Sequence, residues 1–476
     1  MSALLLLAAC TAVCKGPGCE ADWPASRLAV FRGNTLIEGQ LDPATEATLF
    51  TGSDDAGSSW SVAGLPEQML IAQPDADAVV LVDDLDEGGD IAPVASWISD
   101  GTRFGAAMAV DRSNRDESFN LWVGGPDWGL GTGAVWLFGD AHLDGLREDA
   151  SNADLRIAGS SAADQFGTNI VLCGDLTGDD LPEVAVTAPW LEETVSDCSD
   201  LEQQPTFGLE RICSLAGSVF LLHSELLQNA STGDDPWDLG TVYLGSTEGD
   251  GAGHAVVCDR DLTGDGIPDL VIGAPWYDNA AGRVYIIEGG NLGEGGSLDE
   301  ATERRIDPPN KGENWLGMSL TTLSLFGDNA FDLAIGAPGF GGGKGRVLLY
   351  RGASLINSNS PDPYRQIRAD ETREEVDHMG RWLATGSVYA GNLSDLVVGA
   401  PDYRGGTSNP FDTGHAWVWR GDDSSDWEEI VHVADATAEI VGTEPFQRVG
   451  RRPAIHDVDG DGLDDILLVT RSESNE

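Results

Sequence analysis

Short apolar runs of four to six residues, each bounded by turn residues, recur along most of this chain. Residues 270–274 read Leu-Val-Ile-Gly-Ala and residues 466–469 read Ile-Leu-Leu-Val. Runs of this length, rich in β-branched residues and flanked by Gly or Pro, are typical of buried β-strands. The pattern predicts an all-β protein assembled from many short strands.

Three sequence marks recur in a fixed order, which indicates copies of one structural unit. The first mark is an aromatic or apolar residue before Gly, and it falls at Phe104, Phe166, Leu316, Met379 and Val449, while Gly253 keeps only the Gly. The second is a strand end similar to Gly-Ala-Pro, with its proline at Pro74, Pro126, Pro189, Pro275, Pro338 and Pro401. The third is a Gly before an apolar strand, at Gly133, Gly217, Gly282, Gly345 and Gly414.

Three nine-residue stretches, 175–183, 261–269 and 457–465, lie at the same phase of this unit and share one pattern of oxygen-bearing side chains. Such side chains stand at positions 1, 3, 5 and 9, and position 7 can offer its backbone carbonyl. Ca²⁺ prefers many oxygen ligands in a flexible turn, so we predict three calcium sites. The candidate ligands are Asp175, Thr177, Asp179, Leu181 and Glu183; Asp261, Thr263, Asp265, Ile267 and Asp269; and Asp457, Asp459, Asp461, Leu463 and Asp465.

These loops resemble an EF-hand only in part, because their ninth position runs directly into an apolar strand instead of a helix. The alternative is an Asp-rich solvated turn that binds nothing. Three such loops at the same position of the repeat favour metal binding over this alternative. The corresponding stretches near Asp111, Asp328 and Asp395 are lengthened or shortened, so the prediction is limited to three sites.

The order of marks resembles the FG-GAP repeat of integrin α subunits and many bacterial surface proteins, over nearly the whole chain after about residue 25. This resemblance implies four-stranded antiparallel blades of a β-propeller. The six prolines of the second mark indicate six blades. A seventh unit starts at Val449, but the chain ends before the third mark of that unit. Residues 26–33 align with 282–289, so we expect a seven-bladed propeller in which the N-terminal strand completes the last blade.

Acidic residues outnumber basic ones by 80 to 27, which gives a net charge of −53. Nucleic acid and anionic lipid are excluded as partners bound by charge, because both need Lys and Arg. A hydrophobic content of 41% with 14 Trp argues against the disorder that high charge can cause. Solubility in a salty or calcium-rich medium explains most of the charge.

The chain begins with a short apolar run that ends in Leu-Ala-Ala-Cys10 and resembles a bacterial lipobox. No Lys or Arg precedes the run, so a chance match or a start further upstream is the alternative. We expect a lipid on Cys10 to hold the protein outside the cytoplasm, at the bacterial outer membrane or cell surface. The expected division is residues 1–10 as a signal remnant, 11–24 as a tether and 25–476 as the propeller.

Six cysteines remain when Cys10 is set aside, an even number that suits an oxidising compartment. All could be free thiols. The pairs that we consider plausible are Cys198 with Cys213, Cys14 with Cys19, and Cys173 with Cys258.

Aromatic residues follow each Gly-Ala-Pro-like mark, at Trp128, Trp190, Trp276, Tyr277, Phe340 and Tyr403. By resemblance to integrin-like propellers, these loops form the ligand face, opposite the calcium loops. Aromatic rings there would suit sugar rings or extended peptide. Packing of each ring against a neighbouring blade is the alternative. The insertion from Leu191 to Ala216 is the longest of these loops and the expected specificity element.

No His-Glu-x-x-His, Gly-x-Ser-x-Gly or phosphate-cradling motif occurs, so the sequence favours a binding module over an enzyme. We expect a monomeric, calcium-stabilised, extracytoplasmic adhesion or binding propeller for a protein or glycan, attached to the membrane only through its lipid. The alternatives are a polysaccharide-degrading enzyme on the same scaffold and an inert surface component.

Overall fold

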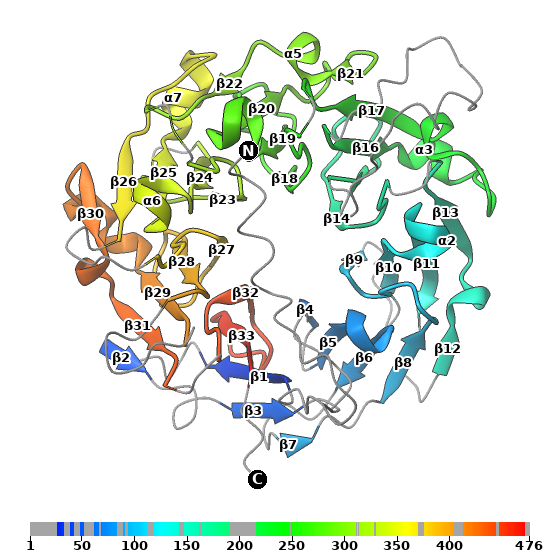
Figure 1. The fold of residues 1–476 in the computed structure, drawn as a ribbon, viewed down its shortest axis with the longest axis horizontal. Coiled ribbons are helices and arrows are strands. Elements are labelled where there is room, and N and C mark those ends of the chain that lie inside the picture. Colours follow the sequence, from blue (N-terminus) through cyan, green and yellow to red (C-terminus); the bar gives the residue numbers. More distant parts are fainter. Residues whose placement is uncertain are drawn as a thin grey trace, which may run out of the picture.

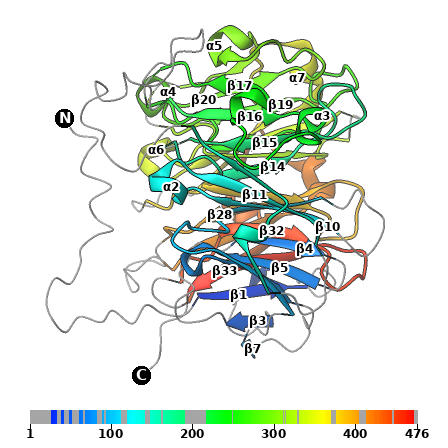
Figure 2. The same ribbon diagram turned by 90° about the vertical axis from the view of Figure 1, so that its right-hand side faces the viewer.

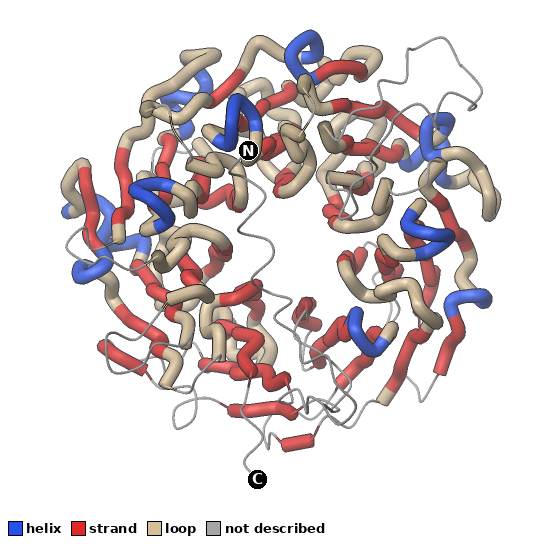
Figure 3. The backbone as a smooth tube through the Cα atoms, in the orientation of Figure 1, coloured by secondary structure: helices blue, strands red, loops and turns tan. Residues whose placement is uncertain are grey.

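Seven β-sheets form a ring in the computed structural model (Figure 1). The structure describes residues 26–32, 39–41, 48–51, 61–65, 68–82, 89–90, 94–111, 119–141, 147–160, 164–189, 216–247, 249–310, 312, 314–327, 330–369, 376–403, 413–443 and 447–471. Strands dominate the ring, and the helices are short segments between them (Figure 3). The prediction of an all-β, seven-bladed propeller is therefore confirmed.

Each blade has four main strands, which are named in order from the innermost to the outermost. Blade 1 consists of β4 (Ser61–Leu65), β5 (Gln68–Gln73), β6 (Ala78–Val82) and β8 (Ala95–Ile98). Blade 2 consists of β9 (Ala107–Asp111), β10 (Phe119–Gly125), β11 (Ala134–Ala141) and β13 (Leu155–Ala158). Blade 3 consists of β14 (Asn169–Leu172), β15 (Val184–Thr187), β16 (Ser218–Leu222) and β17 (Gly240–Leu244). Blade 4 consists of β18 (Ala255–Val257), β19 (Leu270–Ala274), β20 (Arg283–Ile287) and β22 (Arg305–Ile306).

Blades 5 to 7 repeat the same order. Blade 5 consists of β23 (Ser319–Leu323), β24 (Asp332–Gly336), β25 (Arg346–Tyr350) and β26 (Arg365–Arg368), and blade 6 of β27 (Trp382–Gly386), β28 (Asp395–Ala400), β29 (His415–Trp419) and β31 (Ala438–Val441). Blade 7 consists of β32 (Arg451–His456), β33 (Asp465–Arg471), β1 (Ser26–Phe31) and β3 (Thr48–Thr51). The helices are α2 (Trp128–Gly131), α3 (Ser224–Leu227), α4 (Tyr277–Ala280), α5 (Leu298–Ala301), α6 (Phe340–Gly343) and α7 (Gly352–Asn357).

The seventh blade joins the two ends of the described chain. β1 pairs antiparallel with β33 over six residues, from Ser26 opposite Arg471 to Phe31 opposite Ile466. On its other side β1 pairs with β3, so the first strand takes the third position of the last blade. This is the position that the sequence alignment of residues 26–33 indicates, and it leaves no open edge between first and last blades.

Within the described ranges, five blades carry a short fifth strand on their outer edge, supplied by the next blade around the ring. Each of these strands runs parallel to the outermost main strand beside it. They are β2 (Gly39–Leu41), β7 (Gly89–Asp90), β12 (Arg147–Asp149), β21 (Gly296–Ser297) and β30 (Ile430–His432). By pairing with the outer edges, they occupy backbone groups that another chain could otherwise bind.

The repeated glycines mark the places where adjacent blades touch. The Gly before each third strand bridges the aromatic-Gly position of the next blade, as Gly133 does with Phe166 and Gly282 with Leu316. A Cβ atom on Gly273 would lie 2.1 Å from the carbonyl oxygen of Gly317 in the next blade. All three sequence marks therefore meet at the blade junction, where backbones approach too closely for a side chain.

Apolar side chains fill the spaces between neighbouring blades. One cluster joins blades 3 and 4 through Leu221, Tyr243, Ile272 and Tyr285, all fully buried.

In the part of the chain that the structure describes, no helix is long and apolar enough to cross a membrane.

Candidate metal centres

The three predicted metal loops connect the first and second strands of blades 3, 4 and 7. Because successive strands are antiparallel, these loops lie at the opposite end of the blades from the turns that join the second and third strands. Those second turns include α2, α4 and α6, which lie together on one face of the ring (Figure 2). The metal loops thus belong to the other face.

Each loop folds around the carboxylate at its first position. In the second loop, Asp261 Oδ1 accepts from Gly264 N at 2.6 Å and Oδ2 accepts from Gly266 N at 2.8 Å. Asp175 and Asp457 accept the equivalent N–H groups of their own loops. Gly264 and Gly266 have φ of +83° and +92°, a turn that glycine adopts without strain.

The carboxylate at the ninth position is buried and binds the loop backbone. Asp269 Oδ2 accepts from Leu262 N at 2.7 Å and from Thr263 N at 2.8 Å, and its Oδ1 accepts from Gly289 N at 3.0 Å. Burial raises the pKa of Asp269 to about 6, against the lowering effect of these hydrogen bonds. Burial also raises the pKa of Glu183, the ninth residue of the first loop.

Blades without a complete loop keep the same buried acid. Asp332 in blade 5 accepts from Leu325 N and Gly352 N, both at 2.8 Å. Asp395 in blade 6 accepts from Tyr389 N at 2.7 Å and Gly421 N at 2.9 Å. The ninth acid therefore fixes the blade backbone with or without a loop. Sequence reasoning missed Asp332, although an acid that opens the second strand was a usable signal.

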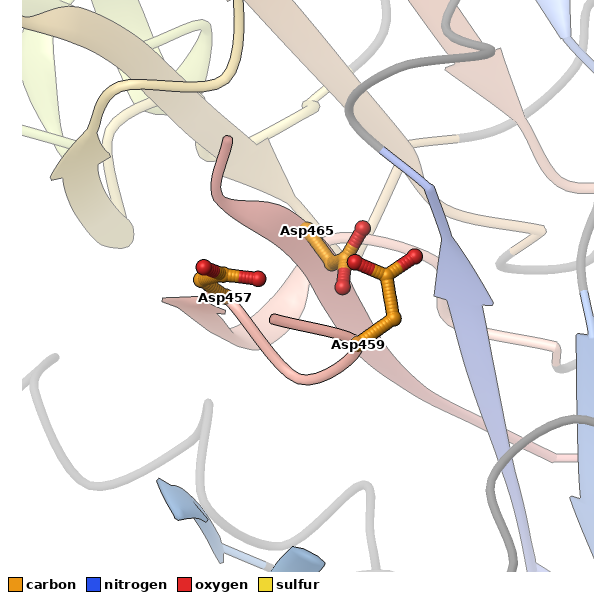
Figure 4. Close-up of side chains that lie close together, drawn as sticks. All are labelled: Asp457, Asp459 and Asp465. Atoms are coloured by element: carbon orange, nitrogen blue, oxygen red, sulfur yellow. The ribbon is translucent and has the colours of Figure 1, made fainter. Parts of the chain in front are cut away.

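The third loop brings three carboxylates closest together (Figure 4). Oxygens of Asp457, Asp459 and Asp465 lie within 4.8 Å of one another, a spacing that one ion could bridge. The first two loops have Thr177 and Thr263 at position 3, and each hydroxyl donates to the ninth carboxylate instead. Hard oxygen donors in a glycine-containing turn fit Ca²⁺ in all three loops.

The position-7 residue of each loop is held in one geometry. The N–H groups of Leu181, Ile267 and Leu463 donate to the position-5 carboxylates of Asp179, Asp265 and Asp461 at 2.8 to 2.9 Å. The predicted ligand sets thus share one local fold.

A disulfide joins blades 3 and 4 just before the first two loops. Cys173 and Cys258 follow the innermost strands of blades 3 and 4, and their Cα atoms lie 4.8 Å apart. This confirms one of the three predicted pairs. Cys10, Cys14, Cys19, Cys198 and Cys213 lie outside the described residues.

The aromatic side chains of the opposite face are half-buried. Three of them stack on an arginine of their own blade: Trp128 on Arg156 at 4.7 Å, Tyr277 on Arg283 at 4.0 Å and Phe340 on Arg346 at 4.0 Å from ring centroid to guanidinium carbon. Trp276 and Tyr403 meet rings of their own blades. Trp190 and residues 191–215 of the insertion lie outside the described part. Trp128, Tyr277 and Tyr403 also pack against apolar clusters that are shared by two adjacent blades.

Two cavities open on this face. One, of about 590 Å³, is lined by Trp128, Asp127 and Arg156 among others. The other, of about 600 Å³, is lined by Phe340, Trp315 and His378 among others. Both are large enough for a small ligand or a few side chains of a partner.

Comparisons with known proteins agree with this blade pattern. The FG-GAP repeat family matches residues 252–287, which hold the second metal loop. Human phosphatidylinositol-glycan-specific phospholipase D is 30% identical over 200 residues, 40% of this chain and 23% of that protein. Integrin alpha-PS2 of Drosophila melanogaster is 32% identical over 182 residues, 34% of this chain and 12% of that protein. The chain thus spans less than a quarter of the length of either relative.

Among solved structures, one described as "Structure of Dos1 propeller" superposes with a TM-score of 0.42 at 10% identity. It covers 89% of this chain and 82% of that one.

Proposed function

We propose that this chain, an FG-GAP-type β-propeller similar to those of integrin α subunits, is a calcium-stabilised binding module that works outside the cytoplasm. The observation that carries the calcium proposal is the convergence of Asp457, Asp459 and Asp465 in a loop whose fold recurs in blades 3 and 4. The candidate ligands are the five residues at positions 1, 3, 5, 7 and 9 of each loop.

A bound ion would supply positive charge to carboxylates that otherwise repel one another. The protein's own part is to hold the loop in shape: the first carboxylate gathers the N–H groups of the turn, and the ninth ties the turn to the end of the third strand. Ion binding to the folded state alone stabilises it by mass action.

Placement outside the cytoplasm is supported by the Cys173–Cys258 disulfide, since structural disulfides persist in oxidising compartments. The similarity to integrin α subunits and the net charge of −53 are consistent with an extracellular, cation-rich medium. Anchoring through a lipid on Cys10 at a bacterial surface is the finer form of this proposal. Mass spectrometry of membrane-extracted protein tests it, and an unmodified Cys10 would count against it.

The proposed ligand is a protein or a glycan bound on the face that carries α2, α4 and α6. Its support is the pair of cavities lined by Trp128 and by Phe340. Aromatic rings give a large contact area at low entropic cost.

Isothermal titration with Ca²⁺ tests the metal sites, and we expect three ions per chain. Screening of the purified protein on glycans and on cell-surface proteins tests the ligand face, with Trp128→Ala and Phe340→Ala expected to weaken binding. Turnover of a polysaccharide by the purified protein would overturn the assignment as a binding module.

A further inference from the structure

Arg32 places a positive charge inside the third metal loop. It directly follows β1, the strand that closes the ring, and its Nη1 lies 3.3 Å from Asp465 Oδ2 and 3.7 Å from Asp459 Oδ2. These are two of the three carboxylates that converge in this loop. The side chain of Arg32 is 14% exposed and that of Asp465 only 1%, so the pair is shielded from bulk water.

The equivalent position, six residues after the Gly that precedes the third strand, carries Arg in blades 5 and 6 but not in blades 3 and 4; in blade 2, which also lacks a complete loop, it is Gly139. Blades 3 and 4 have complete loops, and the residues after their third strands are His223 and Glu288. Blades 5 and 6 lack complete loops, and the equivalent residues are Arg351 and Arg420. Blade 7 alone combines the arginine with a complete loop.

Blade 6 shows what this arginine does where the loop is incomplete. Arg420 Nη2 donates to the carbonyl of Ala390, within the remnant of the loop, at 2.9 Å. Burial raises the pKa of Asp395, and the charge of Arg420 acts against that rise. The guanidinium thus supplies, from within the protein, part of the charge compensation that an ion would bring.

Among the described residues, no such internal cation pairs with the first two loops. Glu288 in blade 4 pairs with Arg304 at 2.8 Å. Among the residues that the structure describes, no ion pair joins Arg or Lys to a carboxylate of the first or second loop. The third loop is therefore distinct in its electrostatics although its sequence matches the pattern best.

We propose that Arg32 acts as a tethered cation in the third loop, so that Ca²⁺ binds there only by displacing its guanidinium. The inference rests on the proposed calcium binding and deepens it. An ion and a guanidinium are both positive and need the same oxygens of Asp459 and Asp465, so each weakens binding of the other. Because Arg32 follows β1, occupancy of this site is linked to the strand that closes the ring.

Calcium titration of the full chain and of Arg32→Gln tests the proposal, with Asp457→Asn used to assign the third site. In the wild-type protein we expect two tighter sites and a third with a dissociation constant at least tenfold higher. Arg32→Gln should tighten the third site at least tenfold and leave the other two unchanged. Arg351→Gln, the same change at the equivalent position of a blade without a complete loop, should alter none of them.

Stability without calcium gives a second readout. In chelator, Arg32→Gln should unfold at a lower temperature than the wild type, because Asp459 and Asp465 lose their cation; saturating Ca²⁺ should remove the difference. If Arg32→Gln fails to fold, Arg32→Lys serves instead. Lysine lacks the forked guanidinium, so it should bind the two carboxylates less firmly, and the calcium affinity of the third site should rise measurably.

Three equal sites in the wild type, or an unchanged or weaker third site in the folded variant, would overturn the role of Arg32. Absence of binding at the first two loops would instead overturn the calcium proposal itself, so the two failures are distinguishable.

Discussion

At the scale of single residues, the buried acid that opens the second strand has two separable roles. In blades 3, 4 and 7 it belongs to a proposed ion site, whereas in blades 5 and 6, which lack a complete loop, it still binds backbone N–H groups. Asp332 is the clearest case of the second role, since it is 1% exposed and bonds Leu325, Phe326 and Gly352.

Asp332→Asn should therefore destabilise the protein equally with and without calcium. The amide cannot accept on both of its ends, so at least one buried N–H loses its partner, at a cost of about 2–4 kcal/mol. Asp261→Asn should instead reduce stability mainly when calcium is present. Urea unfolding of both variants in Ca²⁺ and in chelator measures the contrast. A calcium-dependent loss in Asp332→Asn would contradict the structural role.

Asp402 should make stability depend on pH in the acid range. Burial alone would raise its pKa, but the hydrogen bond with His378 at 2.8 Å and the charge of Arg381 at 3.0 Å lower the pKa to about 2. A depressed carboxylate pKa contributes stability above the unfolded value of about 4, and that contribution disappears as the pH falls towards 2.

We expect Asp402→Asn to be less stable than the wild type by about 2–3 kcal/mol at pH 6. The difference should shrink as the pH falls from about 4 to 2. Urea unfolding between pH 2 and 7 provides the measurement, and a difference that stays constant with pH would exclude Asp402 as its source.

The sequence predicts the metal loops at this scale but not the full role of the ninth acid. Positions 1, 3, 5 and 9 are visible as a local pattern. The partner that Asp269 finds at Gly289, or Asp332 at Gly352, lies 20 residues away, after the next strand. Only the return of that strand to the second one brings these groups together, and a nine-residue motif carries no information about it.

At the scale of elements, the blade junctions depend on glycine because two backbones meet there. Gly273→Ala would place a Cβ 2.1 Å from the carbonyl oxygen of Gly317. We expect a loss of about 3 kcal/mol or more, because backbone on both sides resists movement.

Gly233→Ala is the matched control, since its φ is +104° but nothing lies within 4 Å of the new Cβ. Backbone strain alone should cost about 1–2 kcal/mol there. Thermal unfolding should rank Gly273→Ala well below Gly233→Ala, and the reverse order would show that the junction can widen.

The disulfide ties the innermost strands of blades 3 and 4 across 85 residues of chain. Replacing both Cys173 and Cys258 by Ala should lower the free energy of unfolding by about 2–4 kcal/mol, because the unfolded chain regains the freedom that the cross-link removes. Both sulfurs are buried, so small cavities add to this loss. Denaturant unfolding under oxidising and reducing conditions measures the effect; reductant should destabilise the wild type more than the double variant.

The main strands follow from the sequence because each is an apolar run between recurring glycine and proline marks. The fifth strands do not, since β7 and β21 have two residues each and no hydrophobic period. Their pairing exists only because neighbouring blades lie side by side. The stacking of Phe340 on Arg346 was likewise beyond prediction, because it depends on the turn α6 bringing the ring back over β25.

At the scale of the whole molecule, closure of the ring and the acidic charge act against each other. Repulsion among 80 acidic side chains favours expansion, whereas pairing of β1 with β33 holds the seven blades in a closed ring. Three calcium ions would add six positive charges to a net charge of −53, and they would add them within the loops that hold several acidic side chains each.

Removal of calcium should therefore lower the unfolding temperature far more than a change in ionic strength does. At a free concentration of 100 times the dissociation constant, each ion stabilises the native state by about 2.7 kcal/mol, if the unfolded chain does not bind it. Differential scanning calorimetry in chelator, in Ca²⁺ and in NaCl separates ion binding at the loops from charge screening. NaCl at 1 M reduces the Debye length to about 3 Å, so it weakens the general repulsion between carboxylates without filling the loops. Calcium should stabilise the wild type beyond the NaCl value, and the triple variant Asp175→Asn, Asp261→Asn, Asp457→Asn should lose that excess while it keeps the response to NaCl. Equal responses to the two salts would mean that the loops act only as solvated acidic turns, and that pairing between strands holds the ring closed without ions.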